Sequence, residues 1–452
     1  MNCEVITNFQ ELLADTRTTL AEGIIGKRAF KNSKKLNLLT CLTLIMSPLN
    51  RSLQIELFDH YQKMGKLEEM PTKSAFSQSR KHIYPEVFKN LNQRIKVIET
   101  FEKLKNPKKK KPIRHYPKPK WLAIDGTTFT LPDVKTIKKA FGSIVNQYGS
   151  TPMARGCICL DIDSWKIEHA DIDNINISEK AIALRWFDNF EKGTVLVADR
   201  YYVGYAYFYQ HQKRGLDYLV RLRKNWNNQT KEFIASGADQ ALVTIKIPEK
   251  ALTTLRKEGE KITGKHTMTL RLIKMLDDNG EPVYYATSLL DNQRFTKEYL
   301  HARYHKRWNV ETGIDALKNK YQIECFSGHS PLVIEQDFHA TICYYNFIRL
   351  IYNQADHILQ QNENAKKKTA KKEGKKYVQK QINHNLAIGL ISINFPMLAN
   401  KKKGWKKTFE FIIDLLVRSP EPVRPNRSFK RKKRKLKGRG KYLTLTNYRK
   451  AN

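Results

Sequence analysis

The chain has few cysteines, no long apolar run and none of several common catalytic motifs. Its 452 residues include six cysteines and no CxxC pair, which argues against a disulfide framework or a zinc knuckle. No apolar run reaches the roughly 18 residues of a membrane span, and the first ten residues lack the layout of a signal peptide. No GxSxG, Walker A, GxGxxG or HExxH pattern occurs. We therefore expect a soluble intracellular protein with reduced thiols and no membrane partner.

Acidic residues are scarce relative to basic ones. The chain has 44 Asp and Glu against 82 Lys and Arg, a formal charge of +38. Four runs, 103–120, 364–380, 401–407 and 418–452, carry +34 of this charge. Such runs favour a polyanionic partner, and nucleic acid is the natural one; for any single run the alternative is a solvated low-complexity linker. Composition alone does not distinguish DNA from RNA, or an enzyme from a ribosome-associated binder.

The first hundred residues have apolar positions at helical spacing. After Pro71, Thr72 or Ser74 is a candidate N-cap of a short helix that carries Arg80 and ends near Pro85. A short helix followed by another suits a helix-turn-helix-like DNA-binding unit. A plain helical bundle with a polar face is an equally good interpretation. Residues 103–120 hold four prolines and nine basic residues, so they predict a linker and a domain boundary.

From residue 121 the pattern changes to strands that alternate with helices. The segments WLAIDGTTFTL and GTVLVADRYY predict strands, and a helix begins at Ser178. This order implies a mixed α/β sheet with helices packed against it. Residues 228–294 predict an inserted antiparallel β region. One long helical pattern follows, TKEYLHARYHKRWNVETGIDALKNKY, and further helices are expected at 332–360, 376–391 and 404–417.

Two aspartates are expected at the ends of apolar strands. Asp125 follows WLAI and Asp199 follows VLVA. Carboxylates at strand ends of an α/β sheet face the crevice where ligands bind. Two that converge would form a hard oxygen site suited to Mg²⁺ or Mn²⁺. For either aspartate alone, a capping or turn role is the simpler interpretation.

Four polar residues recur along the long helical pattern. Tyr304, Arg307, Glu311 and Lys318 are spaced by three, four and seven residues, so one continuous helix would place them on one face, with Trp308 beside Arg307. A carboxylate flanked by cations suits a metal ligand beside groups that grip phosphate. The alternative is an exposed face with an i,i+4 Arg–Glu pair.

These residues resemble a known family, the DDE transposases of bacterial insertion sequences, specifically the IS-four group. The spacing Tyr304–x2–Arg307–x3–Glu311–x6–Lys318 matches the Y-R-E-K signature of that group. The segments DGTTFTLPD and ADRYYVGYAYFYQHQKRGLDYLVRLRKN resemble its first and second aspartate segments. The likeness covers about residues 70 to 450.

The resemblance implies an RNase H-like catalytic core interrupted by a β insertion. It implies that Asp125, Asp199 and Glu311 bind two divalent ions, Mg²⁺ or Mn²⁺, and cleave and transfer DNA strands through a hairpin intermediate. Residues implied to contact DNA are Tyr304, Arg307, Trp308, Lys318 and, more weakly, Arg200. Trp308 is the expected partner for a flipped base, with Trp226 and Trp121 as alternatives.

The predicted partners are the terminal inverted repeats of the element and target DNA, held by a homodimer in the bacterial cytoplasm at the nucleoid. A non-catalytic DNA-binding protein derived from a transposase is the alternative, and an RNA-binding protein is a third. The predicted parts are a helical DNA-binding domain 1–102, a linker 103–120, core segments 121–227 and 295–360, a β insertion 228–294, and C-terminal helices with a basic tail 361–452.

Overall fold

The computed structural model describes residues 3–15, 29–30, 36–47, 51–105, 119–147, 149–277, 279–374 and 377–423. Most of the predicted linker and the tail beyond residue 423 therefore lie outside the described residues. The chain divides into two compact units. Unit 1 comprises Met1–Lys111, Phe129–Ala154 and Ala316–Asn452, and unit 2 comprises Pro112–Thr128 and Arg155–Asp315.

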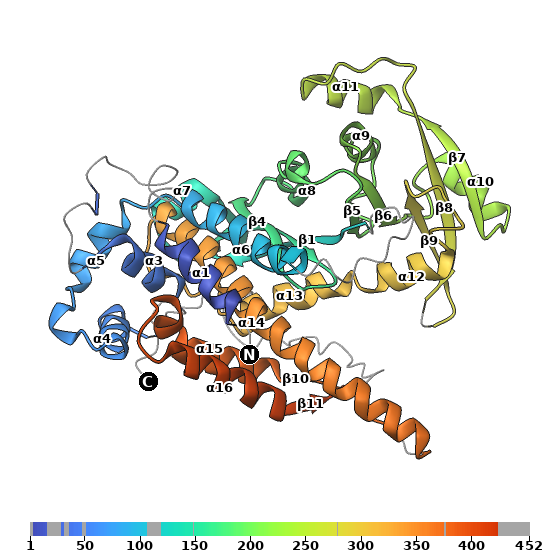
Figure 1. Ribbon diagram of the computed structural model, residues 1–452. Helices are drawn as coiled ribbons and strands as arrows, with labels where there is room; N and C mark the ends of the chain where they lie inside the picture. Colours follow the sequence, from blue (N-terminus) through green and yellow to red (C-terminus); the bar gives the residue numbers. More distant parts are fainter. Residues whose placement is uncertain are drawn as a thin grey trace. The chain divides into compact units, whose positions relative to one another are not determined.

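Unit 1 is mainly helical, and a long helix is at its centre. Its helices are α1 (Glu4–Ala14), α3 (Leu38–Met46), α4 (Leu53–Met64), α5 (Lys73–Arg80), α6 (Glu86–Lys105), α7 (Lys135–Phe141), α14 (Pro331–Lys372), α15 (His384–Ala399) and α16 (Trp405–Arg418), as Figure 1 shows. The first half of α14 is almost wholly buried, and the helix packs against α3, α6, α15 and α16. The helices predicted before the linker and those after the core are thus packed together in one unit.

Side-chain caps set several helix starts in unit 1. The Thr72 hydroxyl accepts a hydrogen bond from the Ala75 amide, so α5 begins where the sequence predicts. Asn383 caps α15 in the same way. The prediction of a helix at 376–391 is wrong at its start, because Lys380–Ile382 form strand β10, which pairs with β11 (Pro420–Pro422). The second basic run is helical up to Lys372, where α14 ends.

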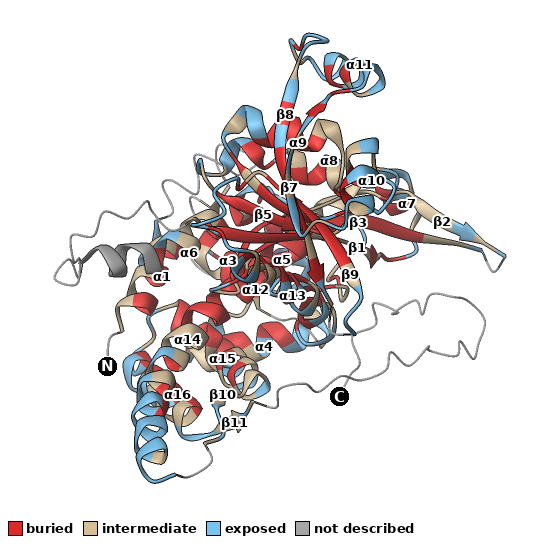
Figure 2. Cartoon of the chain, turned by 90° about the vertical axis from the view of Figure 1, so that its right-hand side faces the viewer, coloured by how far each residue is buried: buried red, intermediate tan, exposed pale blue. Residues whose placement is uncertain are grey.

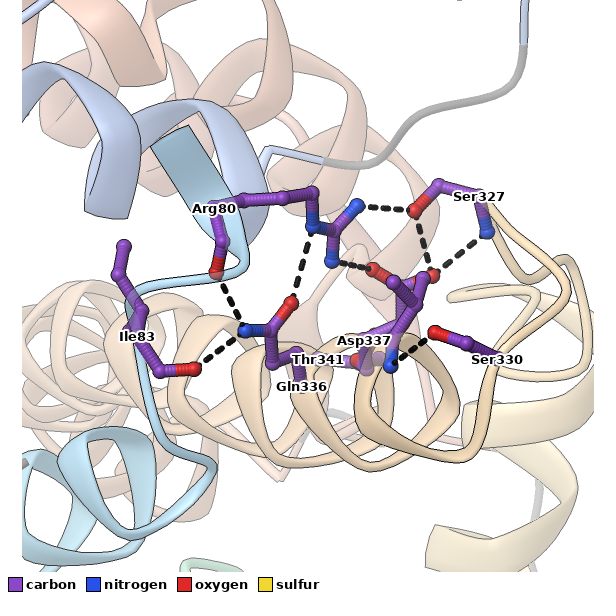
Figure 3. Close-up of polar contacts among 8 residues, drawn as sticks. Arg80, Ile83, Ser327, Ser330, Gln336, Asp337 and Thr341 are labelled. Atoms are coloured by element: carbon purple, nitrogen blue, oxygen red, sulfur yellow. Dashed lines mark hydrogen bonds and ion pairs between the residues drawn. The ribbon is translucent and has the colours of Figure 1, made fainter. Parts of the chain in front are cut away.

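A buried polar network joins α5 to α14 inside unit 1 (Figure 3). The Arg80 side chain donates to Gln336 Oε1 at 2.9 Å, to Ser327 Oγ at 2.5 Å and to Asp337 Oδ1 at 2.9 Å. Gln336 in turn donates to the carbonyl oxygens of Arg80 and Ile83. Arg80 is only 4% exposed. If α5 binds DNA, Arg80 does not take part, because its guanidinium is buried and donates its hydrogen bonds inside the protein.

Unit 2 is built on a mixed sheet. Its strands are β1 (Trp121–Thr130), β3 (Gly149–Asp161), β4 (Ile167–Asn174), β5 (Val195–Ala198), β6 (Asp217–Arg221), β7 (Gln240–Lys246), β8 (Thr267–Leu276) and β9 (Pro282–Thr287), although residues 129–130 of β1 and 149–154 of β3 belong to unit 1. The strand order is β2-β3-β1-β5-β6-β9-β8-β7, where β2 is Ser143–Asn146, and β4 pairs with β3 off this path. The apolar strand β5 is parallel to both β1 and β6, and it is buried along its whole length (Figure 2). The mixed α/β class predicted from the sequence is confirmed.

The β insertion continues this sheet. Strand β9 pairs antiparallel with β6, and β8 pairs antiparallel with both β9 and β7. Short helices α10 (Asn228–Ala235) and α11 (Glu249–Lys257) lie between its segments, and both contribute to one apolar core with α8 (Glu179–Leu184) and α9 (Tyr205–Arg214). The insertion thus extends the sheet edge beyond β6.

The described residues contain neither a membrane-spanning helix nor a disulfide. No helix in these ranges is both long and apolar enough to span a membrane. None of the six cysteines forms a disulfide in these ranges, and Cys157 and Cys159 are fully buried on β3.

Candidate active site

The parallel pairing of β1 with β5 brings the two predicted aspartates together. Trp121 pairs with Val195, and Ala123 pairs with Val197. The paired residues end two positions before each aspartate, and the charge of Asp199 acts on the Asp125 carboxyl. Asp199 directly follows β5, as the sequence predicts. The prediction that Asp125 ends its strand is wrong, because β1 continues to Thr130 alongside the long strand β3.

Asp125 is partly buried, with 21% of its side chain exposed. Its Oδ1 accepts a hydrogen bond from the Gly126 amide at 2.9 Å. Burial raises the pKa of Asp125 to about 6; the Arg307 charge opposes the shift, and the charges of Glu311 and Asp199 add to it. Asp199 Oδ1 accepts a hydrogen bond from the Tyr201 amide at 2.8 Å. Asp125 and Asp199 thus repel each other, and this repulsion favours a bound cation.

The third acid lies after a break in the long helical pattern. The sequence predicts one helix, but α12 (Lys297–His305) ends before α13 (Trp308–Asn319) begins. The Arg307 amide donates to the Tyr304 carbonyl, so the chain tightens into a turn here. Glu311 remains on α13, while Tyr304 is on α12. The four signature residues therefore do not share one helix face.

Arg307 links the carboxylates in spite of that break. Its Nη2 donates to Glu311 Oε1 at 2.6 Å, and its Nη1 lies 3.8 Å from Asp125 Oδ2. The guanidinium carbon lies 5.8 Å from the Tyr304 ring centroid and 5.4 Å from that of Trp308, within cation–π range. Arg307 is 7% exposed. One buried cation thus touches the first and third predicted acids.

The aromatic candidates differ in exposure. Tyr304 is buried, its ring centroid lies 4.5 Å from that of Tyr285, and burial raises the pKa of its hydroxyl, so it stays a neutral phenol. Trp308 is 55% exposed. Trp121 is 2% exposed, which removes it as a partner for a flipped base. Trp226 packs against Tyr205 and lines a pocket in unit 2.

The two remaining cationic candidates occupy different surroundings. Arg200 is exposed and lines a pocket of about 520 Å³ with Arg221, Arg223 and Lys224. Lys318 belongs to unit 1. Its Nζ lies 3.9 Å from Glu324 Oε1 and 5.1 Å from the Phe129 ring centroid, and burial lowers the pKa of its amine. Arg200 therefore contributes to a basic pocket, whereas Lys318 is partly sequestered.

Sequence reasoning missed a fourth acid, Glu179. It is the first residue of α8, whose N-cap Ser178 accepts a hydrogen bond from the Ala181 amide. Burial, together with the charges of Asp125 and Asp199, raises the pKa of Glu179 to about 7. The sequence does indicate that a helix begins at Ser178 and Glu179. The residues around this helix start do not indicate that it packs against the strand that carries Asp125.

In the described part of the chain, no three His, Cys, Asp or Glu side chains are spaced to hold a metal ion. Arg307 forms an ion pair with Glu311, so this carboxylate points at a guanidinium. The donor chemistry nevertheless fits a hard divalent cation, because the acids supply only carboxylate oxygens, and the charges of Glu311 and Asp199 add to the raised pKa of Asp125.

Comparison with known families settles the identity. The family described as "Transposase DDE domain" matches residues 116–347, just over half of the chain. The chain belongs to the DDE-domain transposases. The transposase is 22% identical over 254 residues to the transposase InsG for insertion sequence element IS4 from Escherichia coli (strain K12). The match covers 54% of this chain and 55% of that relative, so the chain spans about half the length of the relative. The predicted IS4-type membership is confirmed.

A solved structure is also similar to the transposase. It is a cryo-EM structure of a piggyBac transposase synaptic complex with hairpin DNA, 10% identical, with a TM-score of 0.37. The likeness covers 84% of this chain and 70% of that one.

Proposed function

We propose that this transposase cuts DNA at the ends of its insertion sequence and joins those ends to target DNA in a metal-dependent reaction. The observation that carries the proposal is that Arg307 contacts both Asp125 and Glu311, while the charge of Asp199 acts on Asp125 from the end of the neighbouring parallel strand. A DNA-binding protein without catalysis has no use for these three acids together. Membership of the DDE-domain transposases supports the same conclusion.

The sheet supports an RNase H-like catalytic core. Along the chain, the neighbouring strands β1, β3 and β4 precede β5 and β6, and β5 is parallel to both β1 and β6. The first acid lies on β1, the second directly follows β5, and the third follows the β insertion on α13. This layout brings acids that are far apart in sequence to one edge of the sheet.

We assign Asp125, Asp199 and Glu311 as the residues that would hold two Mg²⁺ or Mn²⁺ ions. Bound ions would lower the pKa of an attacking water or 3′-hydroxyl and stabilise the leaving oxygen. For Glu311 to act as a ligand, its ion pair with Arg307 has to open. Arg307 then becomes available to a DNA phosphate, for which its planar guanidinium is well suited.

The proposed DNA contacts follow from position and charge. Tyr304, Arg307 and Lys318 are assigned to phosphates at the transposon end, and Arg200 to phosphates near its basic pocket. Trp308 is the proposed partner for a base flipped beside the scissile bond, because its indole is largely exposed next to Arg307. The family resemblance supports a hairpin intermediate, a homodimer on paired inverted repeats, and action in the bacterial cytoplasm at the nucleoid.

The test uses the full chain, Mg²⁺ and DNA that carries the element's ends. Glu311→Gln should lower the cleavage rate by at least about 100-fold, since a metal site contributes several kcal/mol and each 1.36 kcal/mol is tenfold. Glu298→Gln removes an exposed carboxylate from neighbouring α12 and is the matched control. Cleavage by Glu311→Gln at the wild-type rate would overturn the assignment. Binding without cleavage in either metal would favour the non-catalytic alternative.

A further inference from the structure

The turn between β3 and β4 contacts the break between α12 and α13. Asp163 lies in this turn, and its two carboxylate oxygens accept hydrogen bonds from Arg303 on α12 at 3.0 and 2.7 Å. The Lys306 ammonium, in the break itself, donates to Asp163 Oδ1 at 2.8 Å. Beyond the break, Asn309 Nδ2 donates to the Ile162 carbonyl oxygen at 3.0 Å. One turn thus holds the end of the first helix and the start of the second.

The turn is itself held in place by hydrogen bonds. Asp161 Oδ1 accepts from the amides of Asp163 and Ser164 at 2.8 and 3.1 Å, which closes the turn. The Ile162 amide donates to the Trp121 carbonyl oxygen at 3.2 Å, so the turn is also tied to the start of β1. All of these residues belong to unit 2. The break between the helices is therefore fastened to the strand that carries the first acid.

Two arginines, four residues apart, contact this same strand. The guanidinium carbon of Arg303 lies 4.8 Å from the centroid of the Trp121 ring, within cation–π range. Arg307 Nη1 lies 3.8 Å from Oδ2 of Asp125, which is four residues farther along β1. The Arg303 side chain is only 13% exposed, and both of its terminal nitrogens donate to Asp163. The carboxylate in the turn thus holds the end of α12 over β1, next to the point where Arg307 reaches Asp125.

Asp163 is also the anion that offsets two cations at the break. Arg303 and Lys306 are three residues apart, and like charges at such spacing destabilise a helix. Burial opposes the shift, but the hydrogen bonds and charges of these two cations lower the pKa of Asp163, so its carboxylate is ionised at neutral pH. Both cations therefore have a charged partner that is fixed to the sheet.

We propose that Asp163 is a positioning residue for the DNA-cleavage reaction: it fixes the break between α12 and α13 and so places Arg307 beside the first and third acids. The inference rests on the proposed function. Without this carboxylate, the break interconverts with the single helix that the sequence pattern predicts, and Arg307 leaves the turn from which it reaches both acids. Asp163 acts through Arg303 and Lys306 rather than on the reacting atoms.

The experiment compares Asp163→Asn with Asp188→Asn in the full chain. Both substitutions remove the charge of a partly exposed carboxylate whose two oxygens accept from one arginine, but Asp188 pairs with Arg214 of α9. Loss of such a pair has little effect on stability, so both variants should fold, which thermal melting checks. Asp188→Asn should cleave and bind DNA like the wild type.

The first measurement separates cleavage from binding. With saturating protein, Mg²⁺ and DNA that carries the element's ends, Asp163→Asn should lower the single-turnover cleavage rate by about 10-fold or more, because small displacements of catalytic groups are costly. Its DNA affinity should stay within about twofold of the wild type or rise, because the substitution removes a negative charge and releases two cations. A loss of folded protein would lower both quantities together.

Amide hydrogen exchange is a second measurement, which does not depend on cleavage. Backbone hydrogen bonds donated by the amides of Arg307 and Asn309 span the break, so a peptide covering residues 303–310 reports on it. Asp163→Asn should speed exchange in this peptide, because amides are exposed as the break interconverts with a continuous helix. Asp188→Asn should leave the exchange of this peptide unchanged.

The outcomes separate this proposal from the function on which it rests. If the wild type cleaves DNA and Asp163→Asn cleaves at the same rate, or the 303–310 peptide exchanges as in the wild type, the positioning role is refuted and the function stands. An equal loss of cleavage in Asp188→Asn, or a loss that DNA affinity matches, would show a merely structural effect and also refute it. If the wild type cleaves no DNA in Mg²⁺ or Mn²⁺ although exchange responds as expected, the proposed function fails and the positioning role fails with it.

Discussion

Replacing Arg80 by alanine should strongly destabilise unit 1. The substitution removes a guanidinium that donates to three side chains. It leaves Asp337 buried, with Ser327 as its remaining donor among the described residues. Breaking a buried ion pair by removing one partner costs about 3–5 kcal/mol. At about 2–4 °C per kcal/mol for a unit of this size, the melting temperature should fall by roughly 6–20 °C.

The assay is thermal melting of the full chain, followed by far-ultraviolet circular dichroism. Lys81→Ala is the matched control, because Lys81 follows Arg80 directly but is exposed. This substitution should change the free energy of unfolding by less than about 0.5 kcal/mol. Arg80→Lys should fall between the two, since an ammonium cannot reproduce the planar three-way donation. If Arg80→Ala melts within about 2 °C of the wild type, the network does not stabilise unit 1 and the reasoning is refuted.

Four further results are expected. Gly126→Ala should lower the free energy of unfolding of unit 2 by about 1–3 kcal/mol, because the added methyl group overpacks against Glu179. Gly264→Ala is the control: its methyl group would make only an ordinary contact, so its melting temperature should stay close to that of the wild type. Without metal, the Asp125 carboxyl stays protonated up to about pH 6 in the native state, whereas it loses its proton near pH 4 in the unfolded chain. The free energy of unfolding therefore falls as the pH rises from about 4 to about 6. Asp125→Asn should therefore raise the melting temperature more at pH 8 than at pH 4, and an equal change at both would contradict the assigned shift. Replacing the six basic residues at 430–435 by glutamine should weaken DNA binding. In fluorescence-anisotropy titrations at several salt concentrations, the slope of log K against log salt concentration should become shallower by about 0.9 for each phosphate that the run no longer neutralises. An unchanged slope would show that this run does not contact DNA. Trp308→Ala should lower the fluorescence rise of 2-aminopurine placed near the cleavage site, and a rise equal to that of the wild type would exclude stacking on this indole.

The sequence alone determined the local structure and the identity of the main acids. The Thr72 and Ser178 caps are side-chain chemistry within one turn, so the starts of α5 and α8 could be predicted. The apolar run before Asp199 predicted a buried parallel strand, because both faces of such a strand are covered. The Y-R-E-K spacing indicated the family directly, since a signature is itself a property of sequence.

Features that depend on long-range contacts could not be predicted in this way. The break between α12 and α13 falls inside a continuous helical pattern, and it leaves Arg307 in the turn, where it contacts both Asp125 and Glu311. Arg80 looks like a surface residue of a short polar helix until α14, more than 250 positions later, buries it. Glu179 packs closely against β1 because that strand lacks a side chain at Gly126. The sequence determined which acids this transposase carries; only the tertiary structure decided which carboxylates already have a cation and which do not, because that depends on distances between elements far apart in the chain.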